Sequence, residues 1–289
     1  MTNDPVARFA PPLFVLIWAT GFIVARLVAP HADPLHFLSL RYALAVAVLV
    51  PVALAVRAPW PATGRAWGAG LLAGVLLHGG YLGGVFWAVK HGLPAGIAAL
   101  VAGLQPLVTG ALVGPLLGER VSRRRWLGIG VGFCGALLVV APRLGGVEGF
   151  PPFSLLVCFL GVISITFGTI WQKRTAVSAD LRTNTVVQYL GAFAVTMPVA
   201  FLLEEGRLDP TPALLIGLAW AVVGLSIGAI GLLLVLIRRG AVAGVAALLY
   251  LVPPVSALMA YGLFGETLSP VQILGMAVAA LGVAVASRG

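Results

Sequence analysis

The sequence predicts an all-α membrane protein of ten transmembrane helices, arranged as an inverted five-plus-five structural repeat around a central cavity. The composition predicts that this is a membrane protein. Hydrophobic residues make up 60% of the chain and charged residues only 9%, which is too much apolar surface for one soluble core. An internal duplication predicts the repeat, because one stretch of sequence recurs about halfway along the chain.

Charge clusters and Pro/Gly turns divide the chain into apolar stretches of the length that a membrane helix needs. An α-helix crosses a ~30 Å hydrocarbon core with about 20 residues. Strands of a β-barrel are ~10 residues long and alternate in polarity, whereas these stretches are longer and continuous. The expected helices are 10–28, 35–56, 66–89, 93–117, 124–141, 153–172, 183–203, 212–237, 241–264 and 269–287. The first is read as a helix and not as a cleaved signal, because only Arg8 precedes it as a basic residue.

The duplication relates the two halves of the chain at an offset of 147 residues. Residues 21–42 recur at 168–189, with Tyr42 matching Tyr189. We therefore divide the chain into a first five-helix repeat, residues 1–147, and a second, 148–289. Five is an odd number, so two related halves must enter the membrane in opposite directions, and the second repeat is inverted.

The basic residues set the expected orientation. The chain has a net charge of +9, and with a cytoplasmic N-terminus 13 of its 18 basic residues fall on the inner side. The outer side then holds Arg26, Arg41, Lys90, Arg143 and Arg207. The positive-inside rule places both termini in the cytoplasm, and the basic excess is read as this topology signal and not as a nucleic-acid surface.

Glycine pairs and prolines predict where helices meet and bend. Small residues four apart allow close backbone approach between membrane helices, and the pairs are Gly70/Gly74, Gly128/Gly132 and Gly224/Gly228. Pro106 and Pro254 occupy equivalent places in the two halves. Each removes a backbone hydrogen bond, so we expect either two matched hinges or two fixed kinks.

Polar residues near the bilayer centre are the candidate cavity lining. An unpartnered polar group in hydrocarbon costs several kcal/mol, so these side chains should face the bundle or a wet cavity. The candidates are Trp18, His78, Tyr81, Gln105, Ser226 and Tyr250. Ser164, Thr166 and Ser226 have a second reading, because a hydroxyl in a membrane helix usually bonds its own backbone.

The charged residues all fall at the ends of the expected helices or in loops. The cavity is therefore expected to be uncharged and aromatic, and His78 is its one group that could carry a proton near neutral pH. Glu119 and Glu266 lie at mirrored helix ends, as gate residues or as plain solvated charges. No Cys-x-x-Cys or His-Glu-x-x-His motif occurs and no nucleophile with a base is evident, so neither an enzyme nor a metal or other cofactor is expected.

Several of these features coincide in one known superfamily. The duplication, Trp18-Ala19-Thr20-Gly21-Phe22, Arg41-Tyr42, and the Gly-Glu pairs 118–119 and 265–266 together resemble the drug/metabolite transporter superfamily, EamA type. Within it the chain is most similar to the YddG-type aromatic amino acid exporters. The resemblance implies a basket of ten helices with a central cavity, and export across the bacterial inner membrane by alternating access.

Three functions remain in consideration. The first is facilitative export of neutral, especially aromatic, amino acids and related small metabolites, with a small-molecule substrate and membrane lipid as the partners of a monomer. The second is efflux of drugs or organic cations held by cation–π contacts, with or without proton coupling through His78. A membrane enzyme or scaffold is the third, and competition between a cation and an amino acid for flux separates the first two.

Overall fold

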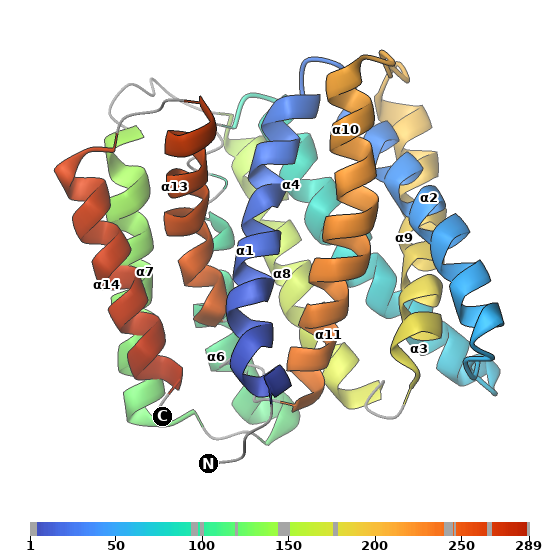
Figure 1. The fold of residues 1–289 in the computed structure, drawn as a ribbon. Helices are drawn as coiled ribbons and strands as arrows, with labels where there is room; N and C mark the ends of the chain where they lie inside the picture. The colour runs from blue at the N-terminus through green and yellow to red at the C-terminus, as the bar shows by residue number, and fades with distance from the viewer. Residues whose placement is uncertain are drawn as a thin grey trace.

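The computed structural model describes residues 5–93, 98, 101–118, 121–143, 151–175, 179–239, 245, 247–264 and 268–287. Regular structure in this part of the chain is helical, apart from one antiparallel bridge between Ala32 and Leu208. Figure 1 shows the helices standing side by side as a bundle, with both ends of the chain on the same side. Glu119 and Glu266, the expected gates, lie outside the described residues.

The helices follow the expected order along the chain. The first half contains α1 (Pro5–Val28), α2 (Pro34–Ala55), α3 (Gly64–Gly74), η1 (Val75–Gly80), α4 (Tyr81–Lys90), α6 (Gln105–Leu117), α7 (Arg123–Val140) and η2 (Ala141–Arg143). The second half contains α8 (Pro152–Thr175), α9 (Leu181–Leu203), α10 (Pro212–Trp220), η3 (Ala221–Ala229), α11 (Ile230–Arg239), η4 (Leu248–Leu251), α13 (Val252–Phe264) and α14 (Pro270–Ser287).

Five described helices are long and apolar enough to cross a membrane by themselves. They are Pro34–Ala55, Gly64–Lys90, Pro152–Thr175, Leu181–Leu203 and Pro212–Arg239. Shorter apolar helices lie at Phe9–Ala25, Gln105–Leu117, Leu248–Leu263 and Pro270–Ala286. The expectation of a helical membrane protein is confirmed at this level.

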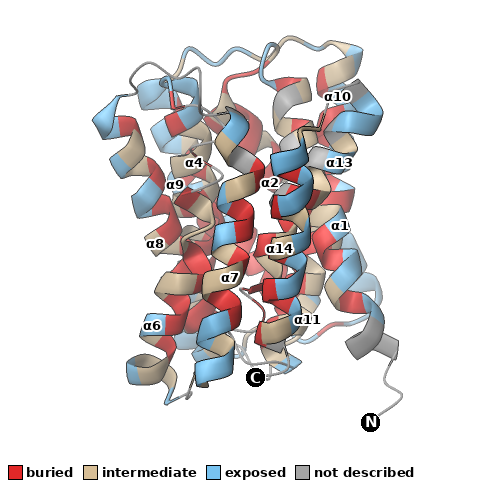
Figure 2. Cartoon of the chain, turned by 90° about the vertical axis from the view of Figure 1, so that its left-hand side faces the viewer, coloured by how far each residue is buried: buried red, intermediate tan, exposed pale blue. Residues whose placement is uncertain are grey.

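The outer surface of the bundle is apolar. Figure 2 shows buried residues on the faces that the helices turn toward one another and exposed residues on the outward faces. Leu202 is 82% exposed and Phe201 66%. Exposing such an apolar surface to water is unfavourable, whereas its contact with lipid tails carries no such cost.

Two glycine pairs mark close helix crossings, as the sequence predicted. A Cβ on Gly74 of α3 would lie 1.8 Å from the carbonyl oxygen of Gln188 on α9. On α7, a Cβ on Gly128 would lie 2.6 Å from the carbonyl oxygen of Gly282 on α14. The third pair is different: the nearest atoms to a Cβ on Gly224 belong to Trp220 of the same helix.

Each of two long spans contains a π-helical segment, η1 and η3, at equivalent places in the two halves. A π turn leaves backbone carbonyls displaced from the α-helical pattern and is common at functional sites. Here hydroxyl groups from other helices reach those carbonyls. Tyr42 donates to the His78 carbonyl at 3.2 Å, Tyr189 to the Ser226 carbonyl at 2.5 Å, and Ser164 to the Leu76 carbonyl at 2.9 Å.

The proline positions correct one expectation. Pro106 and Pro254 were expected inside continuous helices, but α6 begins at Gln105, directly before Pro106. Pro254 lies in the helical stretch Leu248–Leu263, two residues after the 3₁₀ segment η4 passes into α13 at Val252. Proline is well suited to a first helical turn, where its missing N–H is not needed. The α-helical geometry of the two segments starts 147 residues apart, at Gln105 and Val252.

Candidate functional site

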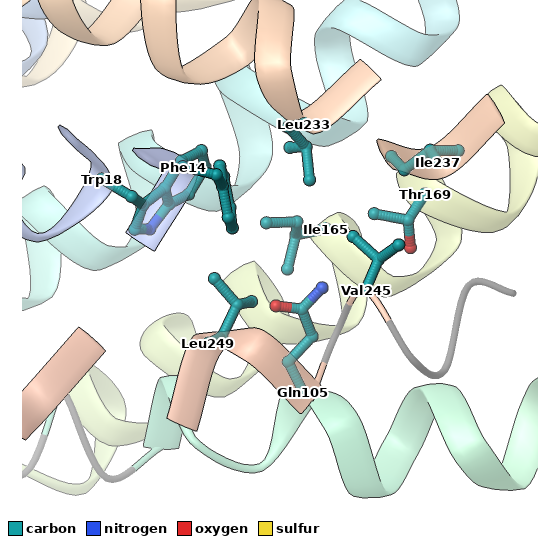
Figure 3. A pocket seen from close by; sticks show the side chains of 9 residues that line it. All are labelled: Phe14, Trp18, Gln105, Ile165, Thr169, Leu233, Ile237, Val245 and Leu249. Atoms are coloured by element: carbon teal, nitrogen blue, oxygen red, sulfur yellow. The ribbon is translucent and has the colours of Figure 1, made fainter. Parts of the chain in front are cut away.

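A small cavity lies among α1, α6, α8, α11 and η4, with a volume of about 10 Å³, room for about one water molecule. Its lining is mostly aliphatic and aromatic, and Figure 3 shows the side chains converging from these separate helices. The lining residues are Phe14, Trp18, Gln105, Ile165, Thr169, Leu233, Ile237, Val245 and Leu249. Two of them, Trp18 and Gln105, were expected from the sequence.

Gln105 is the main polar group of this cavity. It is 3% exposed, and its amide points toward Ile165 and Val245. Among the described residues no hydrogen bond engages that amide, whereas the Thr169 hydroxyl is already used by the Thr166 carbonyl at 2.8 Å. An unengaged buried amide in an apolar cavity is free to hydrogen-bond a polar group.

Next to the cavity, a buried network gathers around His78. The His78 Nε2 lies 3.3 Å from the Gln188 Oε1, and the Gln188 amide donates to Gln172 at 2.8 Å. The rings of Tyr42 and Tyr189 are stacked, with centroids 5.7 Å apart, and the Tyr189 and His78 rings are 4.9 Å apart. Of the expected cavity residues, His78 and Ser226 belong to this network.

Two contacts of this network join the two halves of the chain, and the residues of one contact are the repeat equivalents of the residues of the other. Arg41 of α2 donates from Nε to the Ser226 hydroxyl of η3 at 2.7 Å. Gln188, which stands 147 residues after Arg41, contacts His78, which stands 148 residues before Ser226. The sequence analysis used Tyr42 and Tyr189 as markers of the repeat and placed Arg41 on the outer side, although the repeat offset was the signal for this cross-pairing.

Arg41 corrects the sequence analysis in another respect. It was assigned to the outer end of its helix, and the middle of every span was expected to lack charge. In the structure it is the eighth residue of α2, 6% exposed, and bonded to Ser226 inside the bundle. About 10 Å of helix separates it from the start of α2, so a permanent positive charge lies in the interior.

The remaining expected residues have separate environments. Tyr81 begins α4 and packs with Leu77 and Ile165, so it adjoins the cavity without lining it. Tyr250 is 1% exposed and packs against α7, with its ring 6.5 Å from that of Phe133. Tyr250 lies outside the cavity lining, and its hydroxyl has no partner among the described residues.

Ser164, Thr166 and Ser226 had been given a second reading, in which each hydroxyl bonds its own helix backbone. The structure divides them into two kinds. Thr166 donates to the Val162 carbonyl four residues earlier in its own helix, at 2.9 Å. Ser164 and Ser226 instead join different helices. The local reading is confirmed for Thr166 and is wrong for these two serines.

Polar contacts close one end of the bundle, and we call Asp33, His36, Lys90 and Glu204 the Asp33 lock. Lys90 of α4 donates to Asp33, whose other oxygen accepts from the backbone N–H groups of Gly206 and Arg207 at 3.0 Å. Burial raises the pKa of Asp33, but the Lys90 and backbone donors outweigh it, so the pKa lies below its ordinary value.

Glu204 completes this lock from the end of α9. It accepts from the backbone N–H groups of Leu35 and His36 and lies 3.0 Å from His36 Nδ1, so it caps the first turn of α2. Asp33, His36 and Glu204 are close enough to share a metal ion. Their oxygen atoms are already occupied by N–H donors, so their role in this structure is to tie α2, α4 and α9 together.

The opposite end is cross-linked as well, and it has a broad surface hollow of about 540 Å³, lined by Pro59, Ala179, Asp180, Leu181, Arg182 and Arg238. Thr183 donates to the Pro59 carbonyl there at 2.7 Å. The hydrogen bond from Arg182 keeps the pKa of Asp180 below its ordinary value. A bundle with a buried polar centre and an apolar exterior has the form of a membrane carrier.

Comparison with known proteins agrees with that class. The EamA-like transporter family matches the chain twice, over residues 12–141 and 152–288. The protein therefore belongs to the EamA-like transporter family, within the drug/metabolite transporter superfamily, and is a membrane transporter.

The relatives are bacterial transport proteins. The "Uncharacterized inner membrane transporter YedA" of Escherichia coli K12 is 29% identical over 95% of this chain and 88% of its own length. The "Probable amino-acid metabolite efflux pump" of Salmonella typhimurium LT2 is 29% identical over 92% of this chain and 90% of its own. A crystal structure matches the fold with a TM-score of 0.80 at 22% identity, covering 96% of this chain and 95% of the other.

Proposed function

We propose that the protein exports neutral, especially aromatic, amino acids and related small metabolites across the bacterial inner membrane. The observation that carries this proposal is the cavity, in which apolar walls surround the free amide of Gln105 and the indole of Trp18. Such a lining favours an apolar side chain with a polar end group. The relative named for amino-acid metabolite efflux supports the same class of solute.

The transport cycle is proposed to be alternating access between two inverted repeats, residues 1–147 and 148–289, with ten spans and both termini in the cytoplasm. The cross-paired contacts Arg41–Ser226 and Gln188–His78 support this, because they join equivalent residues of the two halves. The matched starts of α6 and α13 support hinges beside Pro106 and Pro254. In this arrangement the Asp33 lock closes the outer end.

Transport is proposed to be facilitative. A proton-coupled carrier normally keeps an ionisable pair or a carboxylate in the membrane. Among the described residues no carboxylate contacts Arg41 or His78, so a protonated His78 would add a second uncompensated positive charge to a buried site. A single neutral imidazole there serves as a hydrogen-bonding group.

The test is efflux of radiolabelled phenylalanine, threonine and an organic cation from proteoliposomes, with and without a pH gradient. Saturable amino-acid flux that ignores the gradient is the expected result. Strict dependence on the gradient would contradict the facilitative mechanism. Flux of the cation alone would replace amino-acid export by drug or organic-cation efflux, with Trp18 as the cation–π partner.

A further inference from the structure

We infer that Arg41 binds the carboxylate group of the transported solute. This inference rests on the proposed function and names the residue that recognises one end of the substrate. It begins from the cost of a buried cation. Charged side chains inside a membrane protein are expensive and normally pair with an opposite charge or line a polar pathway.

Arg41 has no such opposite charge in the part of the chain that the structure describes. The residue is 6% exposed, and its single hydrogen bond runs from Nε to the neutral hydroxyl of Ser226. The nearest acidic group along α2, Asp33, is bound to Lys90 and to the backbone of Gly206 and Arg207. The positive charge of Arg41 is therefore balanced by no described protein group.

The terminal nitrogens of Arg41 are available to a ligand. They bond no described residue, and they are not among the fully sealed, unpartnered polar atoms of the described interior. A guanidinium presents parallel N–H donors that match a carboxylate in a bidentate geometry. The bond to Ser226 uses Nε and leaves both terminal groups for this purpose.

The partner of Arg41 lies on the same helix face as two residues that line the cavity. Its partner Ser226 begins a buried stripe on one helix, continued by Ile230, Leu233 and Ile237 at spacings of four, three and four residues. Leu233 and Ile237 line the cavity. Ser226 and Leu233 are separated by about 10 Å along the helix, so a solute with a carboxylate at Arg41 would extend its side chain toward the apolar cavity.

The experiment measures flux in proteoliposomes for three probes, corrected for protein-free vesicles. Phenylalanine carries both end groups, phenylacetate lacks the ammonium group, and phenethylamine lacks the carboxylate. The variants are Arg41→Gln and Arg41→Lys. Arg123→Gln is the matched control, because it removes the same charge from an exposed position at the start of α7.

The expected result is a change of selectivity. Losing one charge-assisted carboxylate contact should lower the phenylalanine-to-phenethylamine flux ratio about tenfold or more in Arg41→Gln. Arg41→Lys should recover part of the ratio, and Arg123→Gln should keep it. An unchanged ratio with equal loss of both fluxes would show that Arg41 only holds the helices together, and would overturn the inference.

A measurement on the unaltered protein covers the case in which Arg41→Gln does not fold. Phenylacetate and phenylalanine should each raise its thermal unfolding midpoint, and phenethylamine should not. Stabilisation by phenethylamine alone would overturn the inference. The two proposals fail differently: absence of all amino-acid flux in the unaltered protein refutes the export function, whereas flux with an Arg41-independent selectivity refutes only the role of Arg41.

Discussion

The crossing of α3 and α9 leaves no room for a side chain at Gly74, and Gly74→Ala tests the packing of the buried network. The added Cβ would lie 1.8 Å from the Gln188 carbonyl oxygen and 2.5 Å from the Gln188 Cα. Contacts below 3.0 Å do not occur for real Cβ atoms. Both close atoms belong to the backbone, so no side-chain rotation can relieve the clash and one helix must move away by at least about 1 Å.

That displacement has a cost that can be worked out. Overpacking at a buried contact costs about 1–3 kcal/mol. The His78–Gln188 contact, already 3.3 Å long, would pass beyond hydrogen-bonding distance, at a further cost of about 1 kcal/mol. We expect Gly74→Ala to lower the free energy of unfolding by about 2–4 kcal/mol.

Gly68→Ala is the matched control on the same helix. Nothing lies within 4 Å of a Cβ at Gly68, and replacing glycine by alanine inside a helix stabilises it by about 0.5–1 kcal/mol. Both variants can be measured by reversible unfolding in mixed detergent micelles, followed by tryptophan fluorescence. Equal stability of the two variants would refute the close approach of α3 and α9.

Three further outcomes follow from the site and the lock. Trp18→Ala should raise the KM for phenylalanine efflux severalfold, whereas Trp18→Phe should retain most of the affinity; equal effects would exclude Trp18 from the cavity wall. Tyr250→Phe should leave flux and stability unchanged, because the lost hydroxyl has no described partner, and a weakened substrate affinity would return Tyr250 to the binding site. Asp33→Asn should destabilise the protein at neutral pH. Because the folded-state pKa of Asp33 lies below the ordinary 3.8, its contribution is complete above that pH and disappears as the pH falls through the lower folded value. The difference in unfolding midpoint between Asp33→Asn and the unaltered protein should therefore be constant from pH 8 to pH 5.

The sequence was sufficient for the class of fold and for part of the cavity. Apolar stretches of membrane length need no tertiary information, because each helix satisfies its own backbone within lipid. Trp18 and Gln105 could be selected because a polar group at mid-span depth must face inward. The glycine pairs Gly70/Gly74 and Gly128/Gly132 could be identified for the same local reason, since their spacing alone defines a helix face.

Other features depend on which helices become neighbours. Tyr250 has the same depth and polarity as the cavity residues, but its helix turns it toward α7. The Asp33 lock joins residues more than 100 positions apart, at Asp33 and Glu204, and no local pattern contains that pairing. The start of α6 beside Pro106 and the change from η4 to α13 near Pro254 were visible only as prolines, because proline is compatible with a kink and with a new helix start.

The sequence by itself determined that this protein is a duplicated, helical membrane protein, because hydrophobic length and internal similarity are properties of the chain alone. The tertiary structure decided where its one deeply buried described arginine lies. From the sequence Arg41 was a charge near a helix end, and such charges usually reach water. Only the packing of α2 against η3 encloses it with Ser226, because burial depends on the neighbouring helices and not on distance along the chain.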